Sequence, residues 1–351
     1  MRKLVSIRTI SNITPIEGAD KIEQVSVDGW VVVAQKGIHS VGDTVLYFEI
    51  DSFLPQTDSR FESFMKFGTR TFNGVIGHRI KTVRLRGVYS QGIIMPLVEF
   101  PEIQEIDFDT CYADQIGVVK WERSEETGMI GDAKGSFPSF LRKSDQERIQ
   151  NLYGKLSNSS LATELFVGTL KMDGSSITVF QYPPEYVEEG GDIVGYCSRN
   201  QQLKFPESGD VAAGKFYQGA VNSLLFNKVQ ALHELYGGYY AIQGELVGPG
   251  IQGNFEKFDQ YQVFAYNIFD IQKQRFADYG TFAEMAEAVD LQICPVIYEA
   301  TPILSEPLDK ILSLADGKGL LAPYREGIVW KHLSGSTQFK AISNKYLAKE
   351  E

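Results

Sequence analysis

The sequence predicts an α+β protein in which a small amino-terminal β-barrel precedes a larger domain of antiparallel sheets and helices. The first hundred residues consist of short β-rich runs separated by turn signals, without a long helical pattern. Residues 121–135 are mostly Glu, Ser, Thr, Gly, Asp and Lys, a composition typical of an exposed connector. Beyond this stretch, strand and helix patterns alternate irregularly. A chain of 351 residues suits two domains, and we expect them at 1–120 and 136–351, joined by a linker at 121–135.

The predicted barrel begins with a hairpin. Two β-rich runs, 24–27 and 30–33, flank Asp28-Gly29, a strong signal for a two-residue turn. Further turns and strands are indicated at 41–50, 79–86 and 92–96. Five or so short strands without long helices favour a small barrel, and the OB-fold is the commonest such barrel linked to nucleic acids.

In the second domain, Ser144 has Glu147 three positions later, which predicts a capped helix through about residue 152. A longer helix is expected at 211–235, where leucines and valines recur at helical spacing. Strands are expected at 176–182, 193–198, 239–246, 262–271 and 327–331.

Composition limits the possible classes of protein. Hydrophobic residues make up 43% and charged residues 23%, as in ordinary globular proteins. No apolar run reaches about 20 residues, and the amino terminus lacks the apolar stretch of a signal peptide, so we expect an intracellular, cytoplasmic protein without a membrane partner. Three dispersed cysteines and four histidines support neither a disulfide framework nor a zinc cluster.

The net charge of −11 argues against a protein that coats nucleic acid through its overall field, but a local basic groove remains possible. Arg79, Lys81, Arg84 and Arg86 form such a basic run, which we expect to lie on one strand. The run fits a solvated barrel face and an RNA contact equally well. Arg84 and Arg86 are therefore candidate RNA-binding residues.

The most informative run for chemistry is Lys171-Met172-Asp173-Gly174, between two predicted strands. A lysine at the end of a strand, followed by a tight glycine turn, holds its amine rigidly at a sheet edge where a ligand can approach. The run is a weak signal by itself, because surface turns often contain Lys, Asp and Gly. The runs that follow along the chain strengthen it, at 198–200, 243–248, 264–267, 326–331 and 339–340.

In this order, the runs resemble the motifs of the covalent nucleotidyltransferases, the superfamily of ATP-dependent ligases and RNA capping enzymes. The first half adds runs that resemble the amino-terminal OB domain of one RNA ligase branch, at 15–20, 41–43, 49–55 and 84–87. DNA ligases and capping enzymes usually carry their OB domain after the catalytic domain, so the domain order favours the RNA ligase branch.

The resemblance implies that Lys171 attacks the α-phosphorus of ATP and becomes adenylylated. Asp173, Glu245 and Glu326 would raise the pKa of a neighbouring lysine, whereas the nucleophile must lose its proton. A divalent cation, Mg²⁺ or Mn²⁺, held by these carboxylates directly or through water, resolves the conflict.

The resemblance also implies further contacts to the nucleotide. Glu245 would bind the ribose hydroxyls, Arg199 the ribose or the RNA end, and Tyr266 would stack on adenine. Taken singly, the three residues could instead be an edge charge, a turn residue and a core aromatic. Three cations complete the candidate site: Lys340 and Lys331 on the ATP phosphates, and Arg148, in a run that resembles a pattern before the nucleophile motif, reaching the active site.

Two positions depart from the family pattern. Many RNA ligases have Lys-x-Lys in their last motif, whereas Lys340 is followed by Ala341 and Ile342, so one cation is missing unless Lys345 or Lys331 replaces it. Leu170 stands where many relatives carry Glu before the nucleophile.

We therefore predict an ATP-dependent RNA ligase that seals 3′-hydroxyl and 5′-phosphate RNA ends and works as a monomer. The alternatives are a DNA ligase, a capping-type nucleotidyltransferase, and an OB protein that binds tRNA or other RNA without catalysis. Transfer of label from ATP to the protein separates an enzyme from a pure RNA-binding protein.

Overall fold

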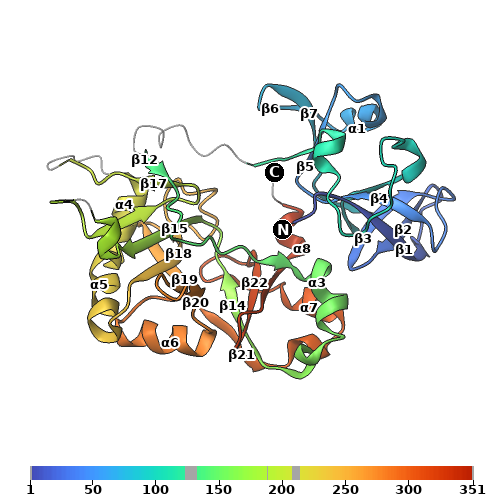
Figure 1. The fold of residues 1–351 in the computed structure, drawn as a ribbon. Helices are drawn as coiled ribbons and strands as arrows, with labels where there is room; N and C mark the ends of the chain where they lie inside the picture. Colours follow the sequence, from blue (N-terminus) through green and yellow to red (C-terminus); the bar gives the residue numbers. More distant parts are fainter. Residues whose placement is uncertain (1, 123–132, 188, 208–213, 350–351) are drawn as a thin grey trace. The chain divides into compact units, whose positions relative to one another are not determined.

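A computed structural model describes residues 2–122, 133–187, 189–207 and 214–349 of the chain, which forms two compact units (Figure 1). The first unit comprises residues 1–124, 147–158 and 344–351, and the second comprises 125–146 and 159–343. This division differs from the predicted domains, because two short segments beyond residue 136 return to the first unit. Most of the predicted linker, 123–132, lies outside the described residues.

The first unit is built on two antiparallel sheets and a separate hairpin. In the larger sheet the strands follow the order β10-β4-β1-β2-β3, with β1 (Val5–Pro15), β2 (Ile22–Val27), β3 (Trp30–Gln35), β4 (Thr44–Phe48) and β10 (Ile93–Pro96). The smaller sheet has the order β11-β5-β7-β6, with β5 (Ser52–Pro55), β6 (Arg70–Phe72), β7 (Val75–Arg79) and β11 (Val119–Lys120). The hairpin pairs β8 (Thr82–Leu85) with β9 (Val88–Gln91).

Short helical and bridging elements complete this unit. They are η1 (Ser59–Phe61), α1 (Glu62–Met65), η2 (Leu97–Glu99), α2 (Ala113–Ile116), β13 (Glu147–Arg148), α3 (Ile149–Leu156) and α8 (Asn344–Leu347).

The predicted hairpin is present. Strands β2 and β3 pair with Val27 opposite Trp30, and Asp28 adopts a φ of 50°, which the turn requires. Trp30 is fully buried and packs near Tyr47 in the core of the larger sheet.

The prediction of a single basic strand was wrong. Arg79 ends β7 and is buried, with Nη2 2.7 Å from Asp51 Oδ1 and its guanidinium 3.8 Å from the centre of the Trp121 ring. Arg84 lies on the next strand, β8, and Arg86 lies in the turn that follows it, where both are exposed. Of the three arginines of the run, only Arg84 and Arg86 therefore face solvent.

The second unit contains two antiparallel sheets. The seven-stranded sheet has the order β12-β17-β16-β15-β18-β19-β20, with β12 (Ala133–Ser136), β15 (Ser175–Gln181), β16 (Val194–Cys197), β17 (Gln201–Leu203), β18 (Tyr240–Val247), β19 (Gln262–Asp270) and β20 (Arg275–Phe276). In the other sheet, β23 (Gln338–Ile342), β22 (Gly327–His332), β14 (Phe166–Lys171) and β21 (Val296–Thr301) follow one another. The predicted strands of this half are thus present.

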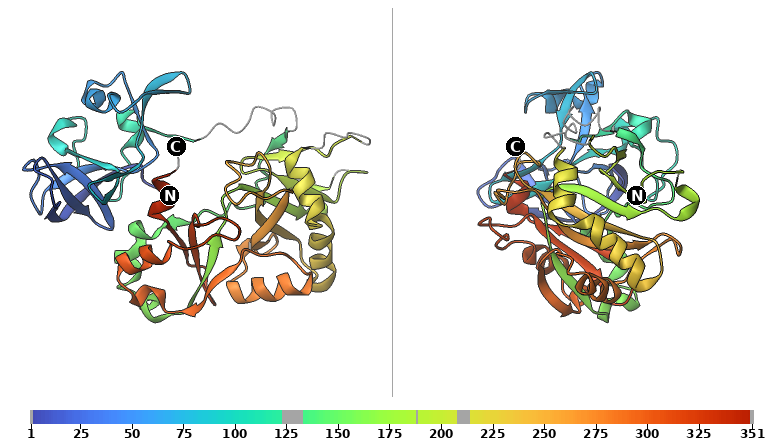
Figure 2. Two further views of the ribbon diagram at one scale, coloured as in Figure 1. Left: turned by 180° about the vertical axis from the view of Figure 1, so that it is seen from behind. Right: turned by 90° about the vertical axis from the view of Figure 1, so that its left-hand side faces the viewer.

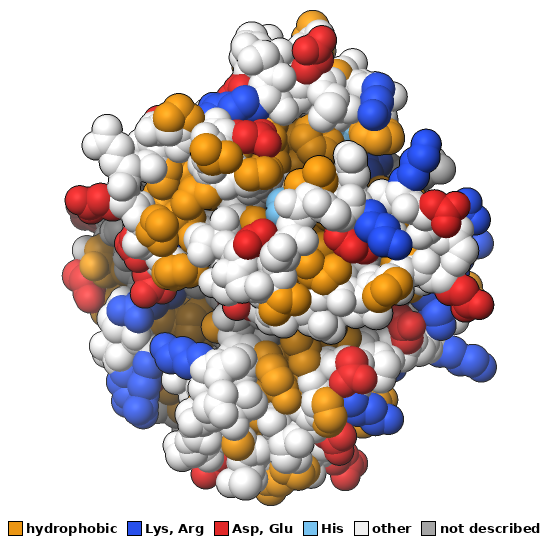
Figure 3. All heavy atoms as spheres, turned by 90° about the vertical axis from the view of Figure 1, so that its right-hand side faces the viewer, with side chains coloured by type: hydrophobic (Ala, Val, Ile, Leu, Met, Phe, Trp, Pro, Cys, Tyr) orange, Lys and Arg blue, Asp and Glu red, His pale blue; other side chains and the backbone are white. Residues whose placement is uncertain are grey.

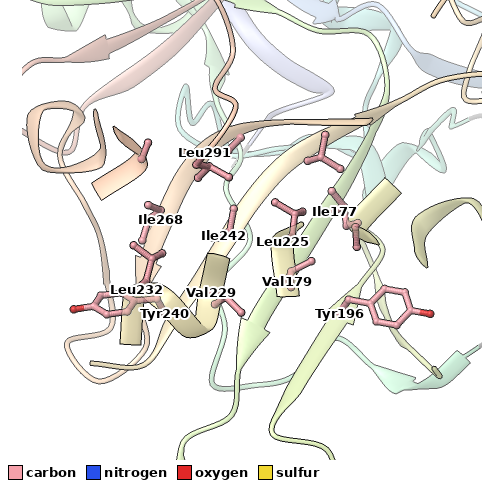
Figure 4. Close-up of a cluster of buried hydrophobic side chains, with 14 of the residues drawn as sticks. Ile177, Val179, Tyr196, Leu225, Val229, Leu232, Tyr240, Ile242, Ile268 and Leu291 are labelled. Atoms are coloured by element: carbon pink, nitrogen blue, oxygen red, sulfur yellow. The ribbon is translucent and has the colours of Figure 1, made fainter. Parts of the chain in front are cut away.

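Helices α4 (Lys215–Asn222) and α5 (Leu225–Tyr236) pack on the seven-stranded sheet, on β18 and β19 and on β15 and β18 respectively (Figure 2). Leu225, Val229 and Leu232 of α5 join Ile177 and Ile242 of the sheet in one buried cluster (Figure 4). The remaining helical elements are η4 (Ser160–Thr163), η5 (Pro184–Tyr186), α6 (Tyr279–Ala288), η6 (Ile303–Ser305) and α7 (Leu308–Leu314).

Three local predictions for this half of the chain need correction. The helix expected from Ser144 begins only at Ile149, because the Ser144 hydroxyl accepts a hydrogen bond from Asn267 Nδ2 at 2.7 Å instead of capping a helix. The expected helix at 211–235 is two helices, separated where Leu224 adopts a φ of 56°, and its residues 211–213 are outside the described part. The last residues of the predicted linker, 133–135, belong to strand β12.

On the face drawn in Figure 3, acidic and basic side chains are interspersed, with apolar side chains between them. Among the described residues, no helix combines the length and the apolar character that crossing a bilayer requires.

Candidate active site

Lys171 is the last residue of strand β14. Strand β14 pairs with β22, and the register places Lys171 opposite Gly327. Gly327 directly follows Glu326 in the sequence. The Lys171 Nζ lies 2.7 Å from Glu326 Oε1 and donates a hydrogen bond to Oε2 at 2.8 Å. The pairing of two strands therefore brings together two groups that are 155 residues apart in sequence.

The turn after Lys171 is held against the seven-stranded sheet. The backbone N–H of Gly174 donates to Glu245 Oε1 at 3.2 Å. A Cβ atom at Gly174 would lie 2.3 Å from the carbonyl oxygen of Leu246, so only glycine lets the turn approach β18 this closely. The turn thus holds the end of strand β14, with Lys171, beside Glu245.

The charges in this cluster shift one another's pKa. Burial acts to lower the pKa of Lys171, but the nearby Glu326, Glu245 and Asp173 outweigh it and raise the pKa above its ordinary value. Burial also raises the pKa of both Glu245 and Glu326 to about 7, although Lys171 opposes the shift. Without a further cation, Lys171 is an ammonium and therefore not nucleophilic.

The carboxylates do not form a compact set of direct metal ligands. Among the described residues, no group of three His, Cys, Asp or Glu side chains is arranged to hold a metal ion. Burial nevertheless raises the pKa of both Glu245 and Glu326 to about 7, so a cation near them would stabilise their ionised forms. A hydrated divalent ion can contact carboxylates through its waters. Both modes that the sequence left open, direct contact and contact through water, stay predictions.

Tyr266 and Arg199 lie close to this cluster. Strand β19 carries Tyr266, whose hydroxyl is 2.9 Å from the Ser176 hydroxyl on β15. Arg199 lies in the turn between β16 and β17, and its positive charge slightly opposes the rise in the pKa of Glu245 that burial causes. Its Nη2 is 3.0 Å from Asp145 Oδ1.

Lys340 shares the sheet face of the nucleophile. It lies opposite Val329, which in turn lies opposite Thr169, two residues before Lys171. Residues directly opposite one another in an antiparallel sheet point to the same face. Lys340 is therefore placed within reach of a ligand at Lys171, and Ile342, two residues later, is buried.

Lys331 is on the same face but makes different contacts. It is buried, and its Nζ donates to the backbone carbonyl of Tyr266 and lies 3.3 Å from Asn267 Oδ1. Burial lowers its pKa to about 8. Lys331 thus links β22 with β19, and its predicted contact with the ATP phosphates stays a prediction.

Arg148 lies in the first unit, not in the unit that carries Lys171. It is buried, its Nε is 3.9 Å from Glu49 Oε1, and its guanidinium is 5.7 Å from the centre of the Trp30 ring. Its predicted contact with the active site stays a prediction.

The candidate RNA contacts are also in the first unit. Arg84 covers the Tyr89 ring at 5.3 Å, and Arg86 lies at the tip of the β8–β9 hairpin.

Sequence reasoning missed Ser176 as a site residue. In the sequence, only its position in the strand after the Lys171–Gly174 turn pointed to it. The register of β15 with β18 puts it opposite Glu245, and that register becomes known only from the structure.

Comparisons with known proteins agree with this arrangement. A family model described as RNA ligase matches residues 164–347, and a model described as an OB-fold domain matches residues 4–97. Comparison with curated protein sequences finds no match.

Among solved structures, the chain is similar to the RNA ligase of Naegleria gruberi. The structure of that ligase with pyrophosphate has 34% sequence identity and a TM-score of 0.88, covering 100% of this chain and 99% of that one. A variant solved with ATP and manganese, and another with AMP and manganese, each have 34% identity and a TM-score of 0.88, covering 99% of both chains. An extended match of this kind, together with the family model over its second half, shows that the chain belongs to the RNA ligase family.

Proposed function

We propose that this RNA ligase uses ATP and a divalent cation to join a 3′-hydroxyl RNA end to a 5′-phosphate RNA end, with Lys171 as its nucleophile. The observation that carries the proposal is the amine of Lys171, held 2.7 Å from Glu326 at the end of a strand and next to a turn that only glycine permits. The solved Naegleria ligase structures with ATP and manganese support the same choice of substrate and ion.

The reaction has three steps. The neutral amine of Lys171 attacks the α-phosphorus of ATP and forms a nitrogen–phosphorus bond as pyrophosphate leaves. An oxygen of the RNA 5′-phosphate then attacks the same phosphorus, and the lysine leaves. Finally, the 3′-hydroxyl attacks the 5′-phosphorus of the RNA and displaces AMP.

The first step requires Lys171 to lose a proton, which its carboxylate neighbours oppose. A bound divalent cation supplies positive charge that lowers the lysine pKa and neutralises the α-phosphate. Glu245 and Glu326 would hold this ion through its waters, and Asp173 adds a third negative charge nearby.

Other residues orient the substrate in this proposal. Tyr266 offers its ring to adenine, and Glu245 accepts from the ribose hydroxyls. Arg199 lies close enough to Glu245 to affect its charge, which supports a contact with the ribose or the RNA end. Lys340 meets the phosphates and stabilises charge that develops on the transferred phosphorus.

RNA engagement by Arg84 and Arg86 belongs to the same proposal. The chain has no Asp or Glu from residue 63 to residue 98, although it carries 45 of them in total. This stretch includes the β8–β9 hairpin, where Arg84 and Arg86 are exposed. A local basic surface on an acidic protein is what a ligase needs to hold a few phosphates.

The test is incubation of the full chain with labelled ATP and Mg²⁺, followed by a nicked RNA duplex with 3′-hydroxyl and 5′-phosphate ends. We expect label on the wild type, none on Lys171→Ala, and a sealed strand from the wild type alone. A folded wild type that never acquires label would be an RNA-binding protein instead. Efficient sealing of an all-DNA nick, with no sealing of RNA, would favour a DNA ligase.

The monomeric state and the intracellular location expected from the sequence remain part of the proposal. Sedimentation of the purified chain tests the first, and fractionation of the source cells tests the second.

A further inference from the structure

Glu256 is a buried carboxylate that the proposed chemistry does not use. It lies in the segment 248–261, which connects β18, the strand of Glu245, with β19, the strand of Tyr266. The segment is ordered by its own contacts, because the Asn254 side chain accepts from the Phe258 N–H at 3.0 Å and donates to the Phe258 carbonyl at 2.9 Å.

The Glu256 carboxylate forms hydrogen bonds with another segment, 315–325, which leads from α7 into β22. It accepts three backbone hydrogen bonds, from Leu320 at 3.1 Å and from Leu321 and Ala322 at 2.6 Å each. A Cβ atom on Gly319 would lie 2.4 Å from Glu256 Oε1, so the carboxylate fills the space beside this glycine.

Further contacts fix the two segments. The rings of Phe255 and Tyr324 meet edge to face with centres 4.8 Å apart. Arg325 is buried and donates to the carbonyls of Leu314, Ala315 and Asp316 at the end of α7. Arg325 therefore ties the two ends of segment 315–325 together at α7, and Glu256 ties its middle to the loop between β18 and β19.

Glu326 is the next residue after this attached segment. Its backbone carbonyl accepts from the Ser343 N–H at 2.8 Å, and the Ser343 hydroxyl donates to Asp316 at 2.6 Å. The Glu326 side chain contacts Lys171, whereas Glu245 comes from the sheet that carries Glu256. The contact made by Glu256 thus joins the two sheets that supply the two carboxylates with a pKa near 7.

We propose that Glu256 is a positioning residue for the ligase reaction: it holds segment 315–325 and thereby sets the separation of Glu245 and Glu326, on which the hold on a hydrated divalent ion depends. This inference rests on the proposed function. Glu256 touches no substrate and acts through Glu326. A charged acceptor of three N–H groups restrains a loop more strongly than a neutral one, because hydrogen bonds to a carboxylate are charge-assisted.

Two variants probe this contact. Glu256→Gln keeps the shape but removes the charge, and Gly319→Ala leaves Glu256 in place but puts a methyl group where its carboxylate lies. Asp278→Asn is the matched control, because Asp278 also accepts a backbone N–H, that of Thr281 at 2.9 Å, but caps α6. All three are made in the full chain.

The first measurement is the rate of adenylylation from ATP against Mg²⁺ concentration, with folding checked by circular dichroism. We expect the half-saturating Mg²⁺ concentration to rise about tenfold for Glu256→Gln and Gly319→Ala, in line with the loss of one charge-assisted hydrogen bond, and to stay unchanged for Asp278→Asn. The second measurement is Mn²⁺ binding in the presence of ATP on a Lys171→Met background, which cannot turn over. The same two changes should weaken Mn²⁺ binding there.

A double-mutant cycle separates positioning from general stability. If Glu256 acts through Glu326, Glu256→Gln should add little to the metal requirement of Glu326→Ala. Additive effects, or a wild-type metal requirement in folded Glu256→Gln, would overturn the inference. If Glu256→Gln does not fold, Gly319→Ala decides in the same way. A wild type that never becomes adenylylated would instead defeat the proposed function.

Discussion

Two lysines on one face of the same sheet show how differently a fold can treat the same side chain. Lys171 lies among three carboxylates, and its pKa is raised; Lys331 lies beneath Tyr266, facing a carbonyl and an amide, and burial lowers its pKa to about 8. The two lie on adjacent strands, with Lys171 opposite Gly327 and Lys331 opposite Val167. The difference teaches that the neighbours of a lysine, more than its sheet position, decide whether it is available for chemistry or joins two strands.

The largest effect on activity is expected from replacing Lys171. Lys171→Met should reduce formation of the protein–AMP adduct below detection, because it removes the amine that we propose as the nucleophile, while the fold persists. Lys331→Met should still form the adduct. Labelled ATP and a thermal melt check both variants, and an adduct on Lys171→Met would reassign the nucleophile.

The next effect concerns the carboxylate beside Lys171. Glu326→Ala should lower adenylylation by about 10- to 100-fold at limiting Mg²⁺, the usual loss on removing a group that supports a metal, and excess Mg²⁺ should recover much of it. In the wild type, the rate should rise with pH through about 7, where Glu326 ionises, and continue rising as Lys171 loses its proton. Rate profiles against pH and Mg²⁺ test this. An unchanged Mg²⁺ requirement in Glu326→Ala would remove Glu326 from the metal site.

For Lys331 we expect pH to affect the free energy of unfolding instead of the reaction rate. Its folded pKa of about 8 is below the ordinary value of 10.5. Between these values the unfolded state binds more protons, so the contribution of Lys331 to stability should rise with pH across the window, by up to ~3 kcal/mol. Urea unfolding of wild type and Lys331→Met from pH 7 to 10.5 measures the difference. If that difference does not change with pH, Lys331 is not a buried amine with a lowered pKa.

Variants of Tyr266 test the proposed binding of adenine. Tyr266→Ala should raise the KM for ATP about fivefold, since an aromatic stacking contact is worth about 1 kcal/mol. Tyr266→Phe keeps the ring and loses only the contact with Ser176, so its KM should stay near the wild-type value. Equal KM values for Tyr266→Ala and Tyr266→Phe would show that the ring does not bind adenine.

The smallest effect is expected in the first unit, which carries neither lysine. Arg84→Ala and Arg86→Ala should each reduce the slope of log affinity against log salt for RNA by about 1, while adenylylation without RNA stays unchanged. Lys36→Ala, an exposed lysine of the same unit outside the acid-free stretch, is the control. If Arg84→Ala leaves the slope of log RNA affinity against log salt unchanged, the hairpin does not contact RNA and is simply solvated.

Local signals predicted local structure well. The Asp28-Gly29 turn and the strands around Lys171 follow from residues close in sequence. Predictions failed where a distant partner intervened: Ser144 bonds to Asn267 instead of capping a helix, and Arg79 pairs with Asp51 instead of facing solvent. In the site, residue types identified Lys171, but only strand register showed Ser176 beside Tyr266.

The division of the first unit into three segments affects when the protein can fold during synthesis. Domains generally fold as units while the chain emerges from the ribosome, amino-terminal parts first. Here residues 344–349, at the far end of the described chain, group with residues 2–122. The last segment of this unit is therefore synthesised only after the second unit, so the contacts that it makes with residues 2–122 form late in translation.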